Sequence, residues 1–143
     1  MPISSDPGTV RTAYQVWQEA EGIPVIRGFY VEDLRTVEVK PWARKGGKGV
    51  FIELEGTGGT NDSYVCEIPP GGTLEPQRHF YEEVIYVIKG RGATSVWVEG
   101  GPKVTFEWQA GSLFAIPLNA WHQHFNGSGT EVARYYGVTT APL

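Results

Sequence analysis

GGTLEPQRHFYEEVIYVIKG, residues 71–90, and GSLFAIPLNAWHQHFN, residues 111–126, are the two stretches that decide how this chain folds. In the first stretch the potential metal ligands are Gln77, His79 and Glu83, and a run of β-branched and aromatic residues follows them. Side chains alternate between the two faces of a strand, so Gln77 and His79 are expected to share one face.

The second stretch contains a turn followed by a short strand. Pro117 and Asn119 are typical turn residues, and they precede a segment in which His122 and His124 share one strand face. Two short strands from separate parts of the chain would then direct imidazole groups into one interior. We therefore expect a site built from both stretches.

The spacing within both stretches resembles that of the cupins, a family of small β-barrel proteins. The first cupin motif is G, five residues, H-x-H, three or four residues, E, six residues and G, and its counterparts here are Gly71, Gln77, His79, Glu83 and Gly90. The second motif is G, five residues, P-x-G, two residues, H, three residues and N, and its counterparts are Gly111, Pro117, Asn119, His122 and Asn126. Every interval fits.

Two positions depart from the cupin pattern, because Gln77 stands at the first histidine position and Asn119 replaces a glycine. Asparagine tolerates the left-handed backbone that a turn can need, so the second departure is compatible with the fold. Within the motifs, residues 77–79 (QRH) and 121–126 (WHQHFN) are similar to segments of gentisate-type ring-cleaving dioxygenases, whose iron is held by three histidines. This chain instead keeps Glu83.

The resemblance implies an all-β fold: a cupin, that is a jelly-roll-like antiparallel β-barrel, with a short N-terminal helix. We expect residues 1–35 to form an N-terminal arm that carries the helix, and residues 36–143 to form a single barrel domain. Thr12 and Gln15 predict a capping box for the helix, and its apolar stripe is expected at Ala13, Val16, Trp17 and Ala20. The runs that predict strands are 36–42, 50–55, 63–68, 83–89, 93–99, 103–108, 113–116, 121–125 and 132–138.

If the barrel forms, Gln77, His79, Glu83 and His122 are the expected metal ligands. Two imidazoles and one carboxylate suit non-haem Fe(II), with Mn, Ni or Zn as alternatives. Gln77 would either add a weak bond through its amide oxygen or hydrogen-bond a metal-bound water. The alternative is a barrel that has lost its metal because of Gln77.

His124 and Arg134 are further candidates for the site. His124 shares the parity of His122, so it is a candidate catalytic residue that moves protons and contacts substrate; a structural, hydrogen-bonded histidine is the alternative. Arg134 interrupts an apolar run and would meet a substrate carboxylate or pair with an acid such as Glu131. Arg44 to Lys48 forms a basic, glycine-rich loop that is interpreted as a solvated turn, with an anion contact as the alternative.

Two functional hypotheses follow. The first is an Fe(II)-dependent dioxygenase, in which O2 and a small aromatic or dicarbonyl-like substrate that chelates through oxygen react at the metal. The second is a non-catalytic small-molecule-binding module, or a degenerate half of a two-cupin protein. A redox-neutral cupin, such as an isomerase using Zn or Mn, is a third possibility.

The length, charge and composition of the chain limit the kinds of partner that it is expected to bind. The 143 residues suit one domain, and a net charge of −4 with 12 Lys and Arg argues against a nucleic-acid or anionic-membrane partner. The first nine residues have no apolar core of a signal peptide, and the single cysteine, Cys66, fits a reducing compartment, so a cytoplasmic protein is expected. By the resemblance, we also expect a homodimer in which residues 10–39 cross to the partner.

Overall fold

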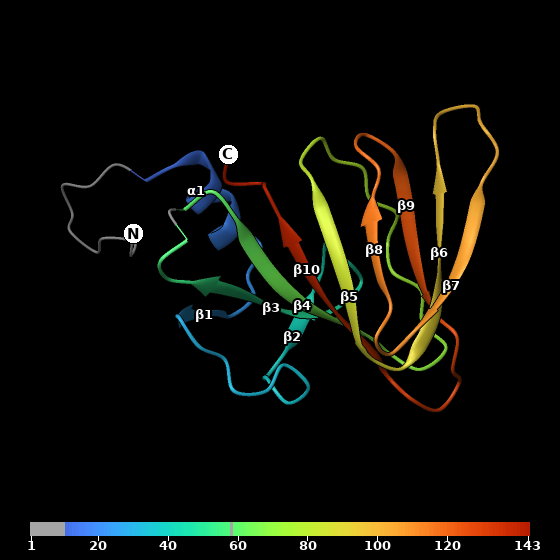
Figure 1. The fold of residues 1–143 in the computed structure, drawn as a ribbon, viewed down its shortest axis with the longest axis horizontal. Helices are drawn as coiled ribbons and strands as arrows, with labels where there is room; N and C mark the ends of the chain where they lie inside the picture. Colours follow the sequence, from blue (N-terminus) through green and yellow to red (C-terminus); the bar gives the residue numbers. More distant parts are fainter. Residues whose placement is uncertain (1–10, 58) are drawn as a thin grey trace.

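The all-β class with one short helix is confirmed. The computed structural model describes residues 11–57 and 59–143, so residues 1–10 of the predicted arm lie outside the described residues. The described residues form two sheets and a helix (Figure 1). Their bounds are α1 (Ala13–Ala20), β1 (Val25–Gly28), β2 (Lys40–Trp42), β3 (Gly47–Leu54), β4 (Asp62–Ile68), β5 (Glu83–Lys89), β6 (Arg91–Trp97), β7 (Val104–Gln109), β8 (Leu113–Ile116), β9 (Trp121–Asn126) and β10 (Ala133–Thr139).

The larger sheet has the strand order β1-β3-β4-β10-β5-β8, with β2 also paired to β3, and the smaller sheet has the order β7-β6-β9. The pairing of β1 with β3 is parallel, and the other pairings are antiparallel. In Figure 1, α1 and β1 lie at one end of the molecule, and the smaller sheet lies at the other end beside β5 and β8.

Residues 72–77 connect the two sheets. Their backbone bonds to the free edge of β9 through isolated bridges from Thr73 to Phe125 and from Gln77 to His122. The chain then crosses to β5 in the larger sheet. The residues that leave one sheet for the other are therefore those of the first quoted stretch.

The core lies between the sheets, because both supply apolar side chains to it. Ile85, Val87 and Tyr135 come from the larger sheet and Trp108 comes from the smaller one, and all four are buried. Gly137 of β10 lies opposite Tyr64 of β4, and a Cβ at that glycine would stand 2.5 Å from the tyrosine ring. Glycine is therefore needed there to admit the Tyr64 ring.

The segment before β2 covers part of the outer face of the larger sheet. Val31, Leu34, Val37 and Val39 pack against a second apolar cluster centred on β3 and β4. The strand predicted over residues 36–42 is consequently shorter, because Val37 and Val39 lie on the sheet and only residues 40–42 pair in it.

The capping box of α1 is present as predicted, but the predicted apolar stripe is wrong except for Trp17. Val16 is 55% exposed, whereas Gln18 is 1% exposed. Gln18 donates a hydrogen bond of 2.8 Å to Glu53, and Tyr14 donates one to Asp62. These hydrogen bonds to Glu53 and Asp62 thus determine which face of α1 packs on the sheet. No helix of the described residues is long and apolar enough to cross a membrane.

Candidate metal centre

Backbone pairing brings the two quoted stretches together. The N–H of Gln77 donates to the carbonyl of His122, and the N–H of His122 donates to the carbonyl of Gln77, both at 2.9 Å. Asn119 has a φ of 59°, which is the left-handed turn that asparagine tolerates, and its N–H bonds the carbonyl of His79 at 2.9 Å. His79 and His122 are consequently held on facing segments.

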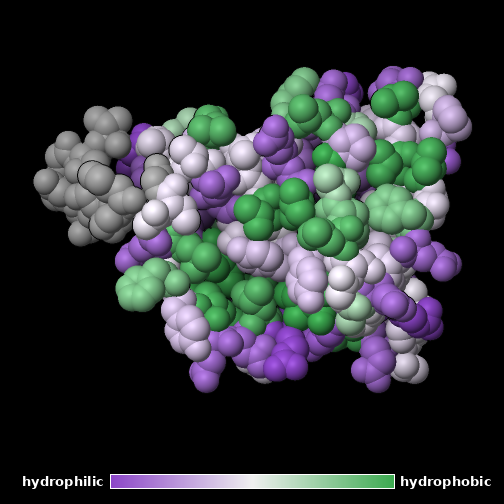
Figure 2. All heavy atoms as spheres, in the orientation of Figure 1, coloured by the Kyte–Doolittle hydropathy of each residue, from purple (hydrophilic) through white to green (hydrophobic). Residues whose placement is uncertain are grey.

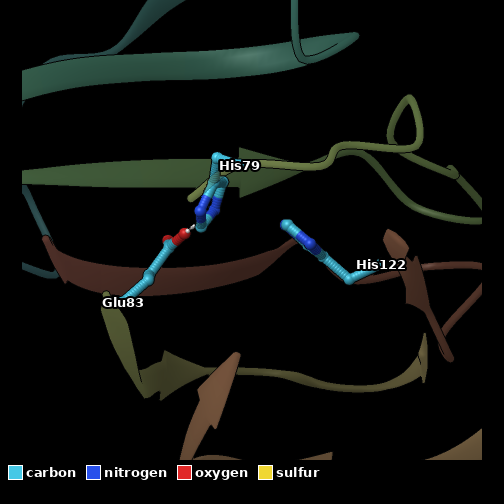
Figure 3. Close-up of side chains that lie close together, drawn as sticks. All are labelled: His79, Glu83 and His122. Atoms are coloured by element: carbon cyan, nitrogen blue, oxygen red, sulfur yellow. Dashed lines mark hydrogen bonds and ion pairs between the residues drawn. The ribbon is translucent and has the colours of Figure 1, made fainter. Parts of the chain in front are cut away.

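His79, Glu83 and His122 form a compact set of potential metal ligands. One ligand atom from each lies within 4.8 Å of the others. Glu83 is the first residue of β5, His122 is on β9, and His79 lies in the crossing between the sheets (Figure 3). Figure 3 shows His79 bonded to Glu83, with the ring of His122 directed towards them.

The contacts of His79 are those of a histidine that can bind a cation. Its Nδ1 lies 3.0 Å from the carbonyl of Tyr81, and its Nε2 lies 2.8 Å from Oε1 of Glu83. A carbonyl only accepts, so Nδ1 carries the proton there, and a neutral ring then turns the lone pair of Nε2 towards a carboxylate. Two lone pairs at this separation need a proton or a metal ion between the groups. The donor set therefore fits a divalent cation.

Charge in the centre is set by burial and by hydrogen bonds. Burial works to raise the pKa of Glu83, but its hydrogen bonds and the nearby Lys45 ammonium outweigh burial and lower that pKa to about 2. Burial lowers the pKa of His122 to about 4, so its imidazole is neutral at pH 7 and carries a lone pair for a metal. The centre at neutral pH thus holds one carboxylate and at least one neutral imidazole ligand.

Two residues that sequence reasoning missed lie beside Glu83. Tyr64 donates its hydroxyl hydrogen to Oε2 of Glu83, and Nζ of Lys45 lies 3.4 Å from the Tyr64 hydroxyl. Lys45 is 6% exposed, so the solvated turn predicted for residues 44–48 is wrong at this position. The turn folds Lys45 inward because its ammonium meets the ring faces of Tyr64 at 4.6 Å and Trp42 at 5.3 Å.

The side chain of Gln77 bonds to Arg44. The guanidinium donates to the amide oxygen of Gln77 at 2.6 Å, and the amide nitrogen donates to the carbonyl of Arg44 at 3.2 Å. Arg44 also bonds Glu21. The amide oxygen is the side-chain atom of Gln77 that could bind a cation, and in this structure it accepts from Arg44. We therefore place Gln77 beside the centre, where it positions Arg44. The three candidate ligands are then His79, Glu83 and His122.

His124 lies behind His122, and their ring centroids are 5.4 Å apart. Thr94 Oγ1 accepts from Trp108 Nε1 at 2.8 Å and lies 2.7 Å from Nδ1 of His124, and we assign the hydroxyl hydrogen to the bond with Nδ1. The proton of the neutral His124 ring is then on Nε2. Burial lowers the pKa of His124 to about 3, so this ring is a neutral N–H donor.

Arg134 is not brought to this centre. It is 5% exposed and lies at the outer side of the larger sheet, where its guanidinium donates to Glu67 at 3.1 Å and to the carbonyls of Leu34 and Val37 at 3.0 Å. The predicted substrate contact is replaced by the alternative, an ion pair, with Glu67 in place of Glu131. Arg134 fastens the segment that covers the sheet.

The chain matches a family model described as a cupin domain over residues 64–139. No curated protein matches it significantly. It is similar to the Lactobacillus farciminis oxalate decarboxylase formate complex at 25% identity and a TM-score of 0.63, covering 79% of this chain and 35% of that one. It is similar to the Bacillus subtilis oxalate decarboxylase, which has Mn(II) centres, at 22% identity and a TM-score of 0.62, covering 77% and 29%.

The cupin domain of Schizosaccharomyces pombe Cnp3 is also similar, at 16% identity and a TM-score of 0.61, with coverage of 76% of this chain and 71% of that one. The chain spans about a third of the length of the two decarboxylases. Similarities below 25% identity show the shared fold.

Proposed function

This chain belongs to the cupin domain family, and from that premise we propose that it is an Fe(II)-dependent dioxygenase whose small substrate binds through two oxygen atoms. The observation that carries the proposal is the compact set of His79, Glu83 and His122, of which Glu83 and His122 are buried and His79 is half-buried. A face of two histidines and one carboxylate suits non-haem Fe(II) and leaves positions open for substrate and O2. The resemblance of residues 77–79 and 121–126 to gentisate-type dioxygenases supports the same reaction class.

The bound metal would act as a Lewis acid towards substrate oxygens and as the redox centre for O2. Both oxygen atoms of O2 enter the products as one carbon–carbon bond of the substrate breaks, so no external reductant is needed. An activated aromatic or dicarbonyl-like compound with two adjacent oxygens is the substrate class.

The residues of the chain hold and orient the reacting groups. Tyr64 donates to one oxygen of Glu83 and leaves the other for the metal, while the Tyr81 carbonyl fixes the ring of His79. One carboxylate on a divalent ion leaves a positive centre that attracts an enolate, a catecholate or a 2-hydroxy acid. His124 offers its Nε2–H to an oxygen of the bound substrate and so stabilises negative charge there.

A second candidate is a redox-neutral Mn(II) enzyme that acts on a small carboxylic acid. The observation that favours it is the 25% identity with an oxalate decarboxylase, together with the cation Lys45 beside the centre. This enzyme would release CO2 from its substrate and show no net consumption of O2.

The test is the metal content of untagged protein, with O2 uptake measured after anaerobic loading with Fe(II). Near-stoichiometric iron and O2 uptake with catechols, hydroxybenzoates or diketones are expected. His122→Ala should abolish both metal content and uptake, because it removes a buried ligand, whereas Gln109→Ala, an exposed change on β7, should leave both intact.

Three outcomes separate the candidates. O2 uptake that persists in His122→Ala would contradict the proposal. Manganese with CO2 release from oxalate would support the second candidate. No metal in the purified or the loaded sample would leave a non-catalytic binding module.

A further inference from the structure

Lys45 is a buried cation with unused hydrogen-bond donors. Among the described residues, the one hydrogen bond of its side chain is the 3.4 Å contact with the Tyr64 hydroxyl, and its ammonium also lies over the rings of Trp42 and Tyr64. Throughout residues 11–57 and 59–143, no carboxylate lies within ion-pair distance of its Nζ. An ammonium carries three N–H groups, so Lys45 has capacity for an acceptor that the chain does not supply.

Two further donors in the same interior lack acceptors. Among the residues that the structure describes, Nε2 of His124 and the hydroxyl of Tyr135 are buried without a hydrogen-bond partner. The His124 and Tyr135 rings are 5.0 Å apart, and the Tyr135 ring is 5.8 Å from that of Tyr64, on which Lys45 lies. Buried hydrogen-bond donors normally have an acceptor. Lys45, His124 and Tyr135 together therefore indicate a site for a ligand that carries several acceptor atoms.

Charge indicates what that ligand is. When a divalent metal is held by His79, Glu83 and His122, the single carboxylate of Glu83 faces both the metal and the Lys45 ammonium. Positive charge is then in excess in a buried space, where charges interact strongly. A ligand with a negative charge and two acceptor oxygens would neutralise the excess positive charge and accept hydrogen bonds from the unpaired donors.

We propose that Lys45, His124 and Tyr135 form a subsite for a small carboxylate, and that this subsite couples carboxylate binding to metal binding. The coupling rests on the proposed function, because it needs a metal on the three ligands. The carboxylate screens Lys45 from the metal, so each ligand raises the affinity for the other by the same factor. The substrate class narrows accordingly to compounds with a carboxylate, of which a hydroxybenzoate or a 2-oxo acid is an example.

The test uses formate as the anion probe and Mn(II) as the metal probe, both followed by the fluorescence of the buried tryptophans at constant ionic strength. Formate should bind the EDTA-treated chain, and it should raise the affinity for Mn(II) by a factor of about 5–150. Lys45→Met keeps the apolar stem and removes the charge, so it should weaken formate binding at least about tenfold and abolish the coupling. Lys48→Met removes an exposed cation three residues along and should change neither quantity.

The outcomes distinguish this subsite from the metal centre. Formate binding that depends on Lys45, in a chain that takes up no metal, would support the subsite and overturn the proposed function. Mn(II) binding without any effect of formate, or equal formate affinity in the Lys45→Met and native chains, would overturn the subsite and leave the metal centre intact. Thermal melting of each variant checks that it is folded.

Discussion

Glu83 is the carboxylate at the centre of the charged and polar groups in the interior. Its Oε2 accepts a hydrogen bond from Tyr64, its Oε1 lies 2.8 Å from Nε2 of His79, and it is the carboxylate that offsets the charge of Lys45. Burial lowers the pKa of Lys45, and Glu83 opposes that shift. Even without metal, therefore, this carboxylate stabilises a cation that burial alone would penalise.

Removing the charge of Glu83 should destabilise the metal-free chain through Lys45. Glu83→Gln should lower the free energy of unfolding by about 1–3 kcal/mol, because it removes the charge that offsets the buried Lys45 ammonium and weakens the charge-assisted hydrogen bond from Tyr64. In the Lys45→Met background the same change should cost less, since the ammonium that Glu83 offsets is gone. Urea denaturation in EDTA measures this cycle, and equal costs in the two backgrounds would contradict the role given to Lys45.

Some residues of the candidate site could be predicted from the sequence alone, and others could not. The candidate ligands His79, Glu83 and His122 could be predicted as one group because motif spacing and strand parity are properties of the local sequence. Lys45 was not, because nothing near it in the sequence distinguishes a lysine held by the Trp42 and Tyr64 rings from one in solvent. Gln77 was predicted as a ligand from its position in the first motif, and its hydrogen bonds to Arg44 could not be predicted because Arg44 comes from a turn that is distant in the sequence.

At the scale of elements, glycines and β-branched runs predicted most strands, and packing decided the rest. β1 was missed because it has four residues, one of them Arg27, and its pairing partner is the distant β3. The inward face of α1 was mispredicted because Gln18 and Tyr14 find buried partners on the sheet, which outweighs the apolar character of Val16. Long-range partners override local patterns in each case.

The pairing of β10 with β4 also controls the centre, because Gly137 leaves room for Tyr64. Gly137→Ala should destabilise the chain by about 1–3 kcal/mol, since its Cβ would stand 2.6 Å from the Tyr64 hydroxyl. The displaced hydroxyl would release Glu83, so the affinity for Mn(II) should fall as well. Thermal melting and metal titration check both effects. Gly129→Ala, whose Cβ would meet no atom within 4 Å, is the control and should leave both unchanged; an equally mild Gly137→Ala would contradict the prediction.

At the scale of the whole molecule, the outer face of the larger sheet is only partly covered. Residues 31–39 lie on the chain's own β3 and β4, so in this structure that part of the predicted arm does not extend away. Beyond it, Val84 and Tyr86 of β5, Leu113 of β8 and Val138 of β10 are exposed. Figure 2 shows hydrophobic side chains gathered over these strands. We propose that a second copy of the chain covers this face.

Sedimentation velocity tests that homodimer. The native chain should sediment as a dimer, and Tyr86→Glu should shift it to a monomer, because a charge would be buried at the centre of the interface. Val98→Glu changes an exposed apolar residue in the loop between β6 and β7 and should leave the dimer intact. A native chain that stays monomeric at every concentration would contradict the proposal.

The backbone bridge between Gln77 and His122 must form before the three candidate ligands can come together during folding. Its partners are far apart in the sequence, and closing so long a loop costs entropy that only later contacts repay. We therefore expect the three candidate ligands to meet only once both sheets have paired, so that a bound ion would recognise the folded chain alone. By mass action, an ion bound to the three candidate ligands would stabilise the folded chain relative to the unfolded one, so we expect proteolysis to slow as the supply of metal rises.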